Sequence, residues 1–197
     1  MMQDLRIPKK QITFTGKLLD YKDFRQYSDT FIETGTAMGD GVQRAIDADF
    51  KSIHSIEAMP DYFIHSFERF ATNTNVTIWE GLSVQVLPTF TNIKEPCVFF
   101  LDAHPAGPGT AGHEDFILNG EKSEYNQDTI IKHELEIILS GFNRHVIIID
   151  DVNGLNVSGG QYMNQLLLAN PDYKFFFYDE NLSGDHLYKD KILVAIP

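Results

Sequence analysis

Short apolar runs alternate with helix-like stretches along most of this chain of 197 residues. Two of the runs, 98–101 and 146–149, consist only of Val, Ile, Leu and Phe. An apolar run of this length is typical of a parallel strand that is buried on both faces. Strands that alternate with helices predict a parallel sheet with helices packed on both faces. The pattern therefore predicts an α/β, Rossmann-like, doubly wound fold.

The expected elements can be placed along the chain. Seven runs are typical of strands, namely 31–32, 52–56, 76–79, 97–101, 145–149, 173–178 and 191–196. Helices are expected at 41–48, from Pro60 to Phe70, and at 83–87, 128–139 and 161–169. Because no helix-like stretch separates the last two strands, we expect that pair to be antiparallel. The sequence thus predicts a seven-stranded, mostly parallel sheet with an antiparallel last strand.

The length fits one domain of ordinary size. We expect a single domain at 29–197, preceded by an irregular or partly helical lead-in at 1–28. The segment 103–127 contains prolines and glycines and has little periodicity. Because so long a loop in a compact domain is usually functional, we expect it to form a lid over the site.

Composition excludes several classes of function. The chain has 28 acidic residues against 16 Lys and Arg, a formal net charge of -12, which disfavours nucleic acid and anionic membranes as partners. No run has the length needed to cross a bilayer, and no secretory signal is evident. The single cysteine cannot form an internal disulfide, and this favours a reducing, cytoplasmic location.

Two of the apolar runs end in acids. Asp102 and His104 follow one run, and Asp150 and Asp151 follow the other. The carboxyl ends of neighbouring parallel strands meet at one edge of a sheet, where ligands bind in doubly wound folds. Three carboxylates in a small volume repel one another, and a hard divalent cation neutralises them. The alternative for each Asp taken alone is helix capping or exposure to solvent.

A glycine-rich segment, 33–41, joins the first strand to the first helix. Glycines let the backbone turn sharply and approach a ligand closely. Glu57 ends the next strand, where an acid binds ribose hydroxyls in dinucleotide-type folds. The spacing is not G-x-G-x-x-G, and Glu33 would repel a diphosphate but suits an ammonium group. We therefore expect a cationic or zwitterionic nucleoside ligand. The alternative is that neither feature binds a ligand, so that the glycine segment is an ordinary tight turn and Glu57 is a solvent-exposed strand end.

The order of these motifs carries a family resemblance. An acid with spaced glycines is followed by an acid after the second strand and by the segment 80–83, Glu-Gly-Leu-Ser, after the third. In this order the chain resembles the class I S-adenosylmethionine-dependent methyltransferases over about residues 29–197. Many members carry an acid where Leu82 stands, to bind the adenine amino group. The resemblance implies S-adenosylmethionine as the cofactor, held by Glu33, Thr34, Gly35, Thr36, Gly39, Glu57, Gly81, Leu82, Ser83 and Asp102.

The acids after the fourth and fifth strands resemble those of metal-dependent O-methyltransferases. Asp102, Asp150 and Asp151 match the three Asp of the macrolide-sugar enzymes, and catechol enzymes place an Asp and an Asp-Asn pair there. The resemblance implies that the three bind Mg²⁺, which activates and orients a substrate hydroxyl. Asp102 and His104 are the catalytic candidates, and His104 is a general base, a fourth ligand or a loop histidine. The expected function is metal-assisted O-methylation of a small hydroxylated substrate, such as a sugar or a catechol.

Two other functions stay open. One is a non-catalytic module that binds a nucleoside or S-adenosylmethionine on the same fold, which Leu82 and the unusual loop favour. The other is a metal-dependent sugar-nucleotide transferase, which Glu33 disfavours. The short segment before the first strand also leaves room for a site completed by a second copy of the chain in a homo-oligomer.

Overall fold

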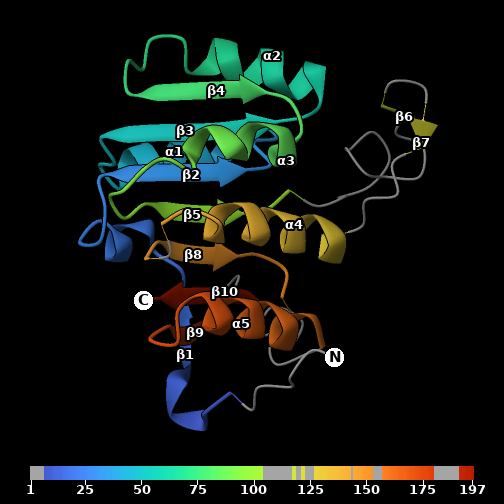
Figure 1. The fold of residues 1–197 in the computed structure, drawn as a ribbon. Coiled ribbons are helices and arrows are strands. Elements are labelled where there is room, and N and C mark those ends of the chain that lie inside the picture. Colours follow the sequence, from blue (N-terminus) through green and yellow to red (C-terminus); the bar gives the residue numbers. More distant parts are fainter. Residues whose placement is uncertain are drawn as a thin grey trace.

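The computed structural model describes residues 7–103, 117–118, 121–122, 127–142, 144–152, 157–179 and 191–197. Eight strands form one sheet in the order β1-β9-β10-β8-β5-β2-β3-β4 (Figure 1). The strands of this sheet are β1 (Ile12–Leu18), β2 (Thr30–Thr34), β3 (Ser52–Glu57), β4 (Val76–Glu80), β5 (Val98–Leu101), β8 (Val146–Ile149), β9 (Lys174–Asp179) and β10 (Ile192–Ile196). A separate antiparallel pair consists of β6 (Ile117–Leu118) and β7 (Glu121–Lys122).

Helices connect most of the parallel strands. They are α1 (Asp40–Asp47), α2 (Pro60–Arg69), α3 (Ser83–Val86), α4 (Gln127–Leu139) and α5 (Val157–Ala169), with short 3-10 helices η1 (Lys9–Gln11), η2 (Tyr21–Phe24) and η3 (Leu87–Phe90). No helix in the described part of the chain is both long and apolar enough to cross a bilayer.

The predicted sheet type is confirmed. Strands β4, β3, β2, β5 and β8 are parallel neighbours, whereas β10 runs antiparallel to both β8 and β9. The expected antiparallel last strand therefore lies between two strands of opposite direction. The predicted α/β Rossmann-like fold is correct, but the sheet contains one more strand than the seven expected.

The additional strand lies where an irregular or partly helical lead-in was expected. Strand β1 pairs in parallel with β9, with Ile12 opposite Phe175 and Phe14 opposite Phe177. The Phe14 and Phe177 rings stack with centroids 5.1 Å apart. Because the partner strand lies about 160 residues away along the chain, local composition gave no sign of this pairing. The lead-in at 1–28 thus contributes an edge strand to the domain.

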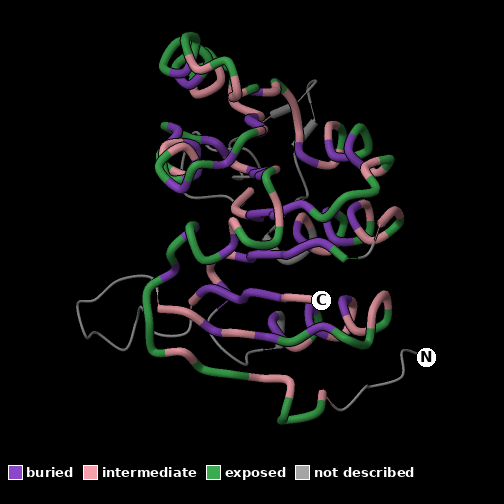
Figure 2. The backbone as a smooth tube through the Cα atoms, turned by 90° about the vertical axis from the view of Figure 1, so that its left-hand side faces the viewer, coloured by how far each residue is buried: buried purple, intermediate pink, exposed green. Residues whose placement is uncertain are grey.

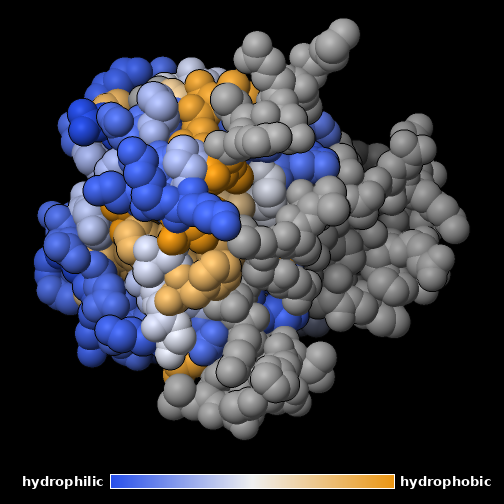
Figure 3. Space-filling model, turned by 90° about the horizontal axis from the view of Figure 1, so that it is seen from below, coloured by the Kyte–Doolittle hydropathy of each residue, from blue (hydrophilic) through white to orange (hydrophobic). Residues whose placement is uncertain are grey.

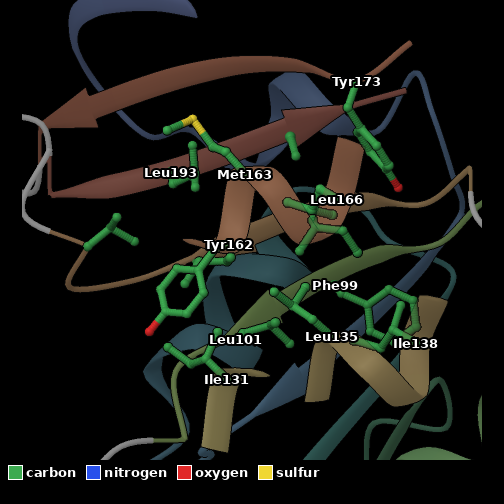
Figure 4. Close-up of a cluster of buried hydrophobic side chains, with 14 of the residues drawn as sticks. Phe99, Leu101, Ile131, Leu135, Ile138, Tyr162, Met163, Leu166, Tyr173 and Leu193 are labelled. Carbon is green, nitrogen blue, oxygen red and sulfur yellow. The ribbon is translucent and has the colours of Figure 1, made fainter. Parts of the chain in front are cut away.

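Each central strand is buried on both faces. In β5, Phe99 and Leu101 belong to a core with α4, α5 and η3, whereas Val98 and Phe100 belong to a core with η2 and α1. Figure 4 shows the first core, in which Phe99 and Leu101 lie beside Ile131, Leu135 and Ile138 of α4. The buried stretches in Figure 2 follow these central strands. Burial on both faces explains why this run lacks polar alternation.

The outer edge of the sheet is less well covered. Phe14 is 51% exposed and Leu18 is 36% exposed on β1. Seen from below, the described surface carries hydrophobic atoms among hydrophilic ones (Figure 3). A sheet edge with exposed apolar side chains is a typical place for association with another chain. The expected homo-oligomer nevertheless stays a prediction.

Candidate functional site

The turn after β2 packs directly against the end of β5. Gly35 has a φ of +84°, and a Cβ on it would lie 2.5 Å from the Asp102 carbonyl oxygen. The Asp102 amide in turn donates to the Thr34 carbonyl oxygen at 3.1 Å. Only a glycine fits both this backbone conformation and this close approach. The predicted glycine turn and the predicted catalytic Asp therefore share one small volume.

Four backbone amides of this turn have acceptors within the protein. Gly35 and Thr36 both donate to the Ile56 carbonyl oxygen, at 3.0 and 3.3 Å. The Ala37 amide donates to Glu57 Oε2 at 2.7 Å, and the Gly39 amide donates to the Thr36 carbonyl oxygen at 2.8 Å. A loop that binds phosphate instead directs such amides at the ligand. This arrangement favours a ligand without a diphosphate.

Glu33 lies beneath the turn and is not among the residues that line the pocket described below. Its side chain is buried, and Ser55 Oγ donates to its Oε2 at 2.5 Å. A Cβ on Gly41 would lie 1.7 Å from Glu33 Oε1, so the carboxyl group packs against the first turn of α1. Burial raises the pKa of Glu33 to about 8, although the Ser55 hydrogen bond opposes the rise. Glu33 thus shapes the turn, and a direct cofactor contact stays a prediction.

Glu57 stands at the end of β3 with both oxygens engaged. Its Oε2 accepts the Ala37 amide and its Oε1 accepts the Met59 amide, each at 2.7 Å. Each carboxylate oxygen can accept a further hydrogen bond. Glu57 also lines the pocket described below, so it links the glycine turn to that pocket.

A pocket of about 210 Å³ opens at the carboxyl ends of β2, β3, β4 and β5. Among the described residues that line it, two are carboxylates and none is Lys, Arg or His. Six of the ten predicted cofactor residues line this pocket, namely Gly35, Glu57, Gly81, Leu82, Ser83 and Asp102. Glu33, Thr34, Thr36 and Gly39 do not line it and support the turn instead. The lining also includes seven residues that were not predicted from the sequence, namely Ala37, Ile56, Ala58, Met59, Tyr62, Ala103 and Ile130.

The three predicted metal ligands lie at the same edge of the sheet. Strands β5 and β8 are parallel neighbours, and the Asp150 amide donates to the Leu101 carbonyl oxygen at 3.1 Å. Asp151 has a φ of +55°, and its amide donates to Asp150 Oδ1 at 2.9 Å. The Lys191 ammonium lies 3.3 Å from Asp151 Oδ1. Asp102 and Asp150 thus follow neighbouring strands at one edge of the sheet, and their joint role as metal ligands stays a prediction.

The described side chains do not by themselves establish a metal site. Within the described residues, no group of three or more His, Cys, Asp or Glu side chains is arranged to hold a metal ion. Asp102 and Asp150 provide oxygen donors at adjacent strand ends, as a hard cation requires. Asp151 Oδ1 faces the Lys191 ammonium, which would compete with a metal ion for this carboxylate. His104 and most of the expected lid at 103–127 lie outside the described residues.

Comparisons with known proteins identify the fold. No protein-family model matches the chain, and neither does any curated relative. A provisionally assigned O-methyltransferase from Klebsiella pneumoniae superposes with a TM-score of 0.57 at 17% identity, over 88% of this chain and 75% of that one. The O-methyltransferase TomG from Streptomyces achromogenes, in complex with S-adenosylmethionine, gives 0.52 at 16% identity, over 87% and 74%. The chain has the class I methyltransferase fold.

A third structure with this methyltransferase fold comes from Streptococcus mutans. It is a provisionally assigned methyltransferase in complex with S-adenosylhomocysteine, with a TM-score of 0.54 at 12% identity, over 89% of this chain and 94% of that one. At such low identities the similarity establishes the fold alone. The predicted resemblance to class I methyltransferases is confirmed at that level.

One buried acid near the pocket was not predicted as a site residue. Glu134 lies on α4, one turn after the pocket residue Ile130, and its side chain is 0% exposed. In the sequence it falls on the apolar stripe that contains Ile131 and Ile138, at the three- and four-residue spacing of one helix face. A carboxyl group on a buried face is the signal that could have identified it.

Proposed function

We propose that this chain is an S-adenosylmethionine-dependent methyltransferase whose cofactor binds in the pocket at the ends of β2–β5. The observation that carries the proposal is the charge of this pocket, since its described lining includes Glu57 and Asp102 but no cationic side chain. The sulfonium and ammonium groups of S-adenosylmethionine suit such a lining, whereas a diphosphate does not. The engaged amides of the glycine turn support the same choice.

Different pocket residues are proposed to bind different parts of the ligand. Glu57 accepts the ribose hydroxyls, as an acid does at this strand end in related folds. Gly81, Leu82 and Ser83 form the wall at the end of β4, where we place the adenine ring against the apolar side chain of Ile130. Gly35 and Asp102 lie at the opposite wall, near the methionine portion. This division leaves the methyl group next to the acidic strand ends.

The finer proposal is O-methylation of a small hydroxylated substrate with the help of a divalent metal. Asp102, Asp150 and Asp151 would hold a Mg²⁺ ion, with Lys191 as a competitor for Asp151. When bound, the metal lowers the pKa of a coordinated hydroxyl, and S-adenosylmethionine supplies the methyl group. The chain itself orients the acceptor and excludes water. His104 is the proposed proton acceptor.

A second candidate function has a specific observation in its favour. The ion pair between Asp151 and Lys191 already neutralises part of the acidic region without a metal. A module that binds S-adenosylmethionine without metal-assisted transfer fits this contact. A sugar-nucleotide transferase fits less well, because a diphosphate finds no cationic partner among the described residues of the pocket.

Methyl transfer from methyl-tritiated S-adenosylmethionine to a panel of sugars and catechols tests the proposal, with Mg²⁺ or with EDTA. We expect transfer that EDTA abolishes and that Asp102→Asn or Asp150→Asn lowers by about 100-fold, because each removes a charged metal ligand. Asp172→Asn, on an exposed turn, is the matched control and should stay fully active. Undiminished transfer in EDTA would refute metal assistance. Cofactor binding without any transfer would favour the non-catalytic module.

A further inference from the structure

Glu134 is a buried carboxyl group for which the proposed chemistry has no use so far. It lies in the middle of α4, between turns that pack their Ile and Leu side chains into the core. Within the described part of the chain, neither of its carboxyl oxygens has a hydrogen-bond partner of standard geometry. Proteins rarely bury an acid in this way, because the unsatisfied group loses its hydration. A buried acid at this position calls for a role at the adjoining pocket.

The surroundings of Glu134 connect it to two walls of the pocket. The hydroxyl groups of Ser83 on α3 and of Thr34 at the end of β2 lie close enough to influence its ionisation. Ser83 lines the pocket on the side of β4. The Thr34 hydroxyl oxygen accepts the Asp102 amide at 3.3 Å on the side of β5. Glu134 therefore lies behind the junction of the proposed adenine wall and the acidic strand end.

We propose that Glu134 is a positioning residue of the cofactor pocket, which acts as a neutral carboxylic acid that holds Ser83 and Thr34 in place. This inference rests on the proposed cofactor. A neutral carboxylic acid donates one hydrogen bond and accepts others, so it can serve both hydroxyl groups at once. Through Ser83 it fixes the adenine wall, and through Thr34 it fixes the backbone of Asp102. It also supplies an acid next to the wall where Leu82 replaces one.

The electrostatics of the site agree with a neutral acid. Burial raises the pKa of Glu134 to about 8, the two hydroxyl groups oppose this rise, and the charge of Asp102 adds to it. Among the described residues, Asp102, directly after β5, is the charged group that influences Glu134, while β2 and α3 contribute the Thr34 and Ser83 hydroxyls. Loss of the proton above pH 8 removes the donor. If cofactor binding needs the neutral Glu134, its affinity should therefore decrease above pH 8.

Titration calorimetry with S-adenosylhomocysteine tests this proposal between pH 6 and pH 9.5. This ligand lacks the sulfonium charge of S-adenosylmethionine, so its attraction to an ionised Glu134 is weaker. For the wild-type chain we expect affinity to fall by about tenfold between pH 7 and pH 9, as for a group with a pKa near 8. Glu134→Gln should bind within about threefold of wild type at pH 7 and should lose this pH dependence. Glu136→Gln, on the exposed face of the same helix, is the matched control.

The possible results distinguish the positioning role of Glu134 from the proposed cofactor binding on which it rests. If Glu134→Gln keeps the wild-type pH dependence, or if folded Glu134→Leu binds as tightly as wild type, the positioning role is wrong although the cofactor proposal stands. If the wild-type chain binds no S-adenosylhomocysteine at any pH, both proposals are wrong. Because Glu134→Gln keeps the shape of the side chain, it decides the question even if Glu134→Leu does not fold.

Discussion

Replacement of Glu33 by Gln should make the protein more stable at neutral pH, and the gain should grow with pH. The folded chain keeps this carboxyl group buried against α1, with a pKa raised to about 8 from 4.5. Between these values the unfolded chain releases a proton that the folded chain keeps. The free energy of unfolding therefore decreases as pH rises through this range, by about 1.4 kcal/mol per pH unit. Glutamine is neutral throughout, so the variant lacks this decrease.

From pH 5 to pH 7 the stability difference between Glu33→Gln and wild type should grow by about 2.5 kcal/mol in favour of the variant. Urea unfolding at pH 5, 6 and 7, followed by circular dichroism, measures this difference. Glu68→Gln, at an exposed position on α2, is the control and should leave the pH dependence unchanged. A Glu33→Gln stability difference that stays constant with pH would show that this carboxyl group is ionised in the folded protein. The electrostatic reasoning for the turn would then be wrong.

Three further changes test other contacts of the site. Glu57→Gln should weaken S-adenosylhomocysteine binding by at least about tenfold in calorimetry, because an amide cannot accept both backbone amides that the carboxylate binds; unchanged affinity would contradict this. Gly35→Ala should destabilise the fold by at least about 2 kcal/mol in urea unfolding, since its Cβ would meet the Asp102 carbonyl oxygen; wild-type stability would refute the close packing. Lys191→Met should raise Mn²⁺ affinity by about fivefold in calorimetry, because it removes a cation that competes for Asp151, whereas equal affinity would show that Lys191 does not compete with a metal.

The central strands could be predicted because burial on both faces requires apolar residues along their whole length. The run 146–149 is buried on both faces, so every residue is apolar and the strand is evident without its neighbours. The acids that follow such runs could likewise be placed at one sheet edge, because parallel neighbours end together. Local sequence was sufficient wherever burial or a strand end decided the structure.

Other features depend on contacts between distant residues. Strand β1 is stabilised by β9, about 160 residues away, and its own residues are mostly polar or exposed. The pair between Lys191 and Asp151 joins residues separated by 40 positions and gives no local pattern. Glu134 was overlooked because a charged residue in a helix is usually exposed, whereas here it lies next to Ser83 and Thr34. Such contacts come from tertiary packing and not from local preference.

Titration calorimetry of the wild-type chain with S-adenosylmethionine and S-adenosylhomocysteine at pH 7, with and without Mg²⁺, tests the central claim most directly. We expect saturable binding of both ligands at one site per chain and no comparable binding of NAD, since the pocket contains carboxylates and four amides of its glycine turn are engaged. Absence of binding for both ligands under all conditions would contradict the proposed cofactor site.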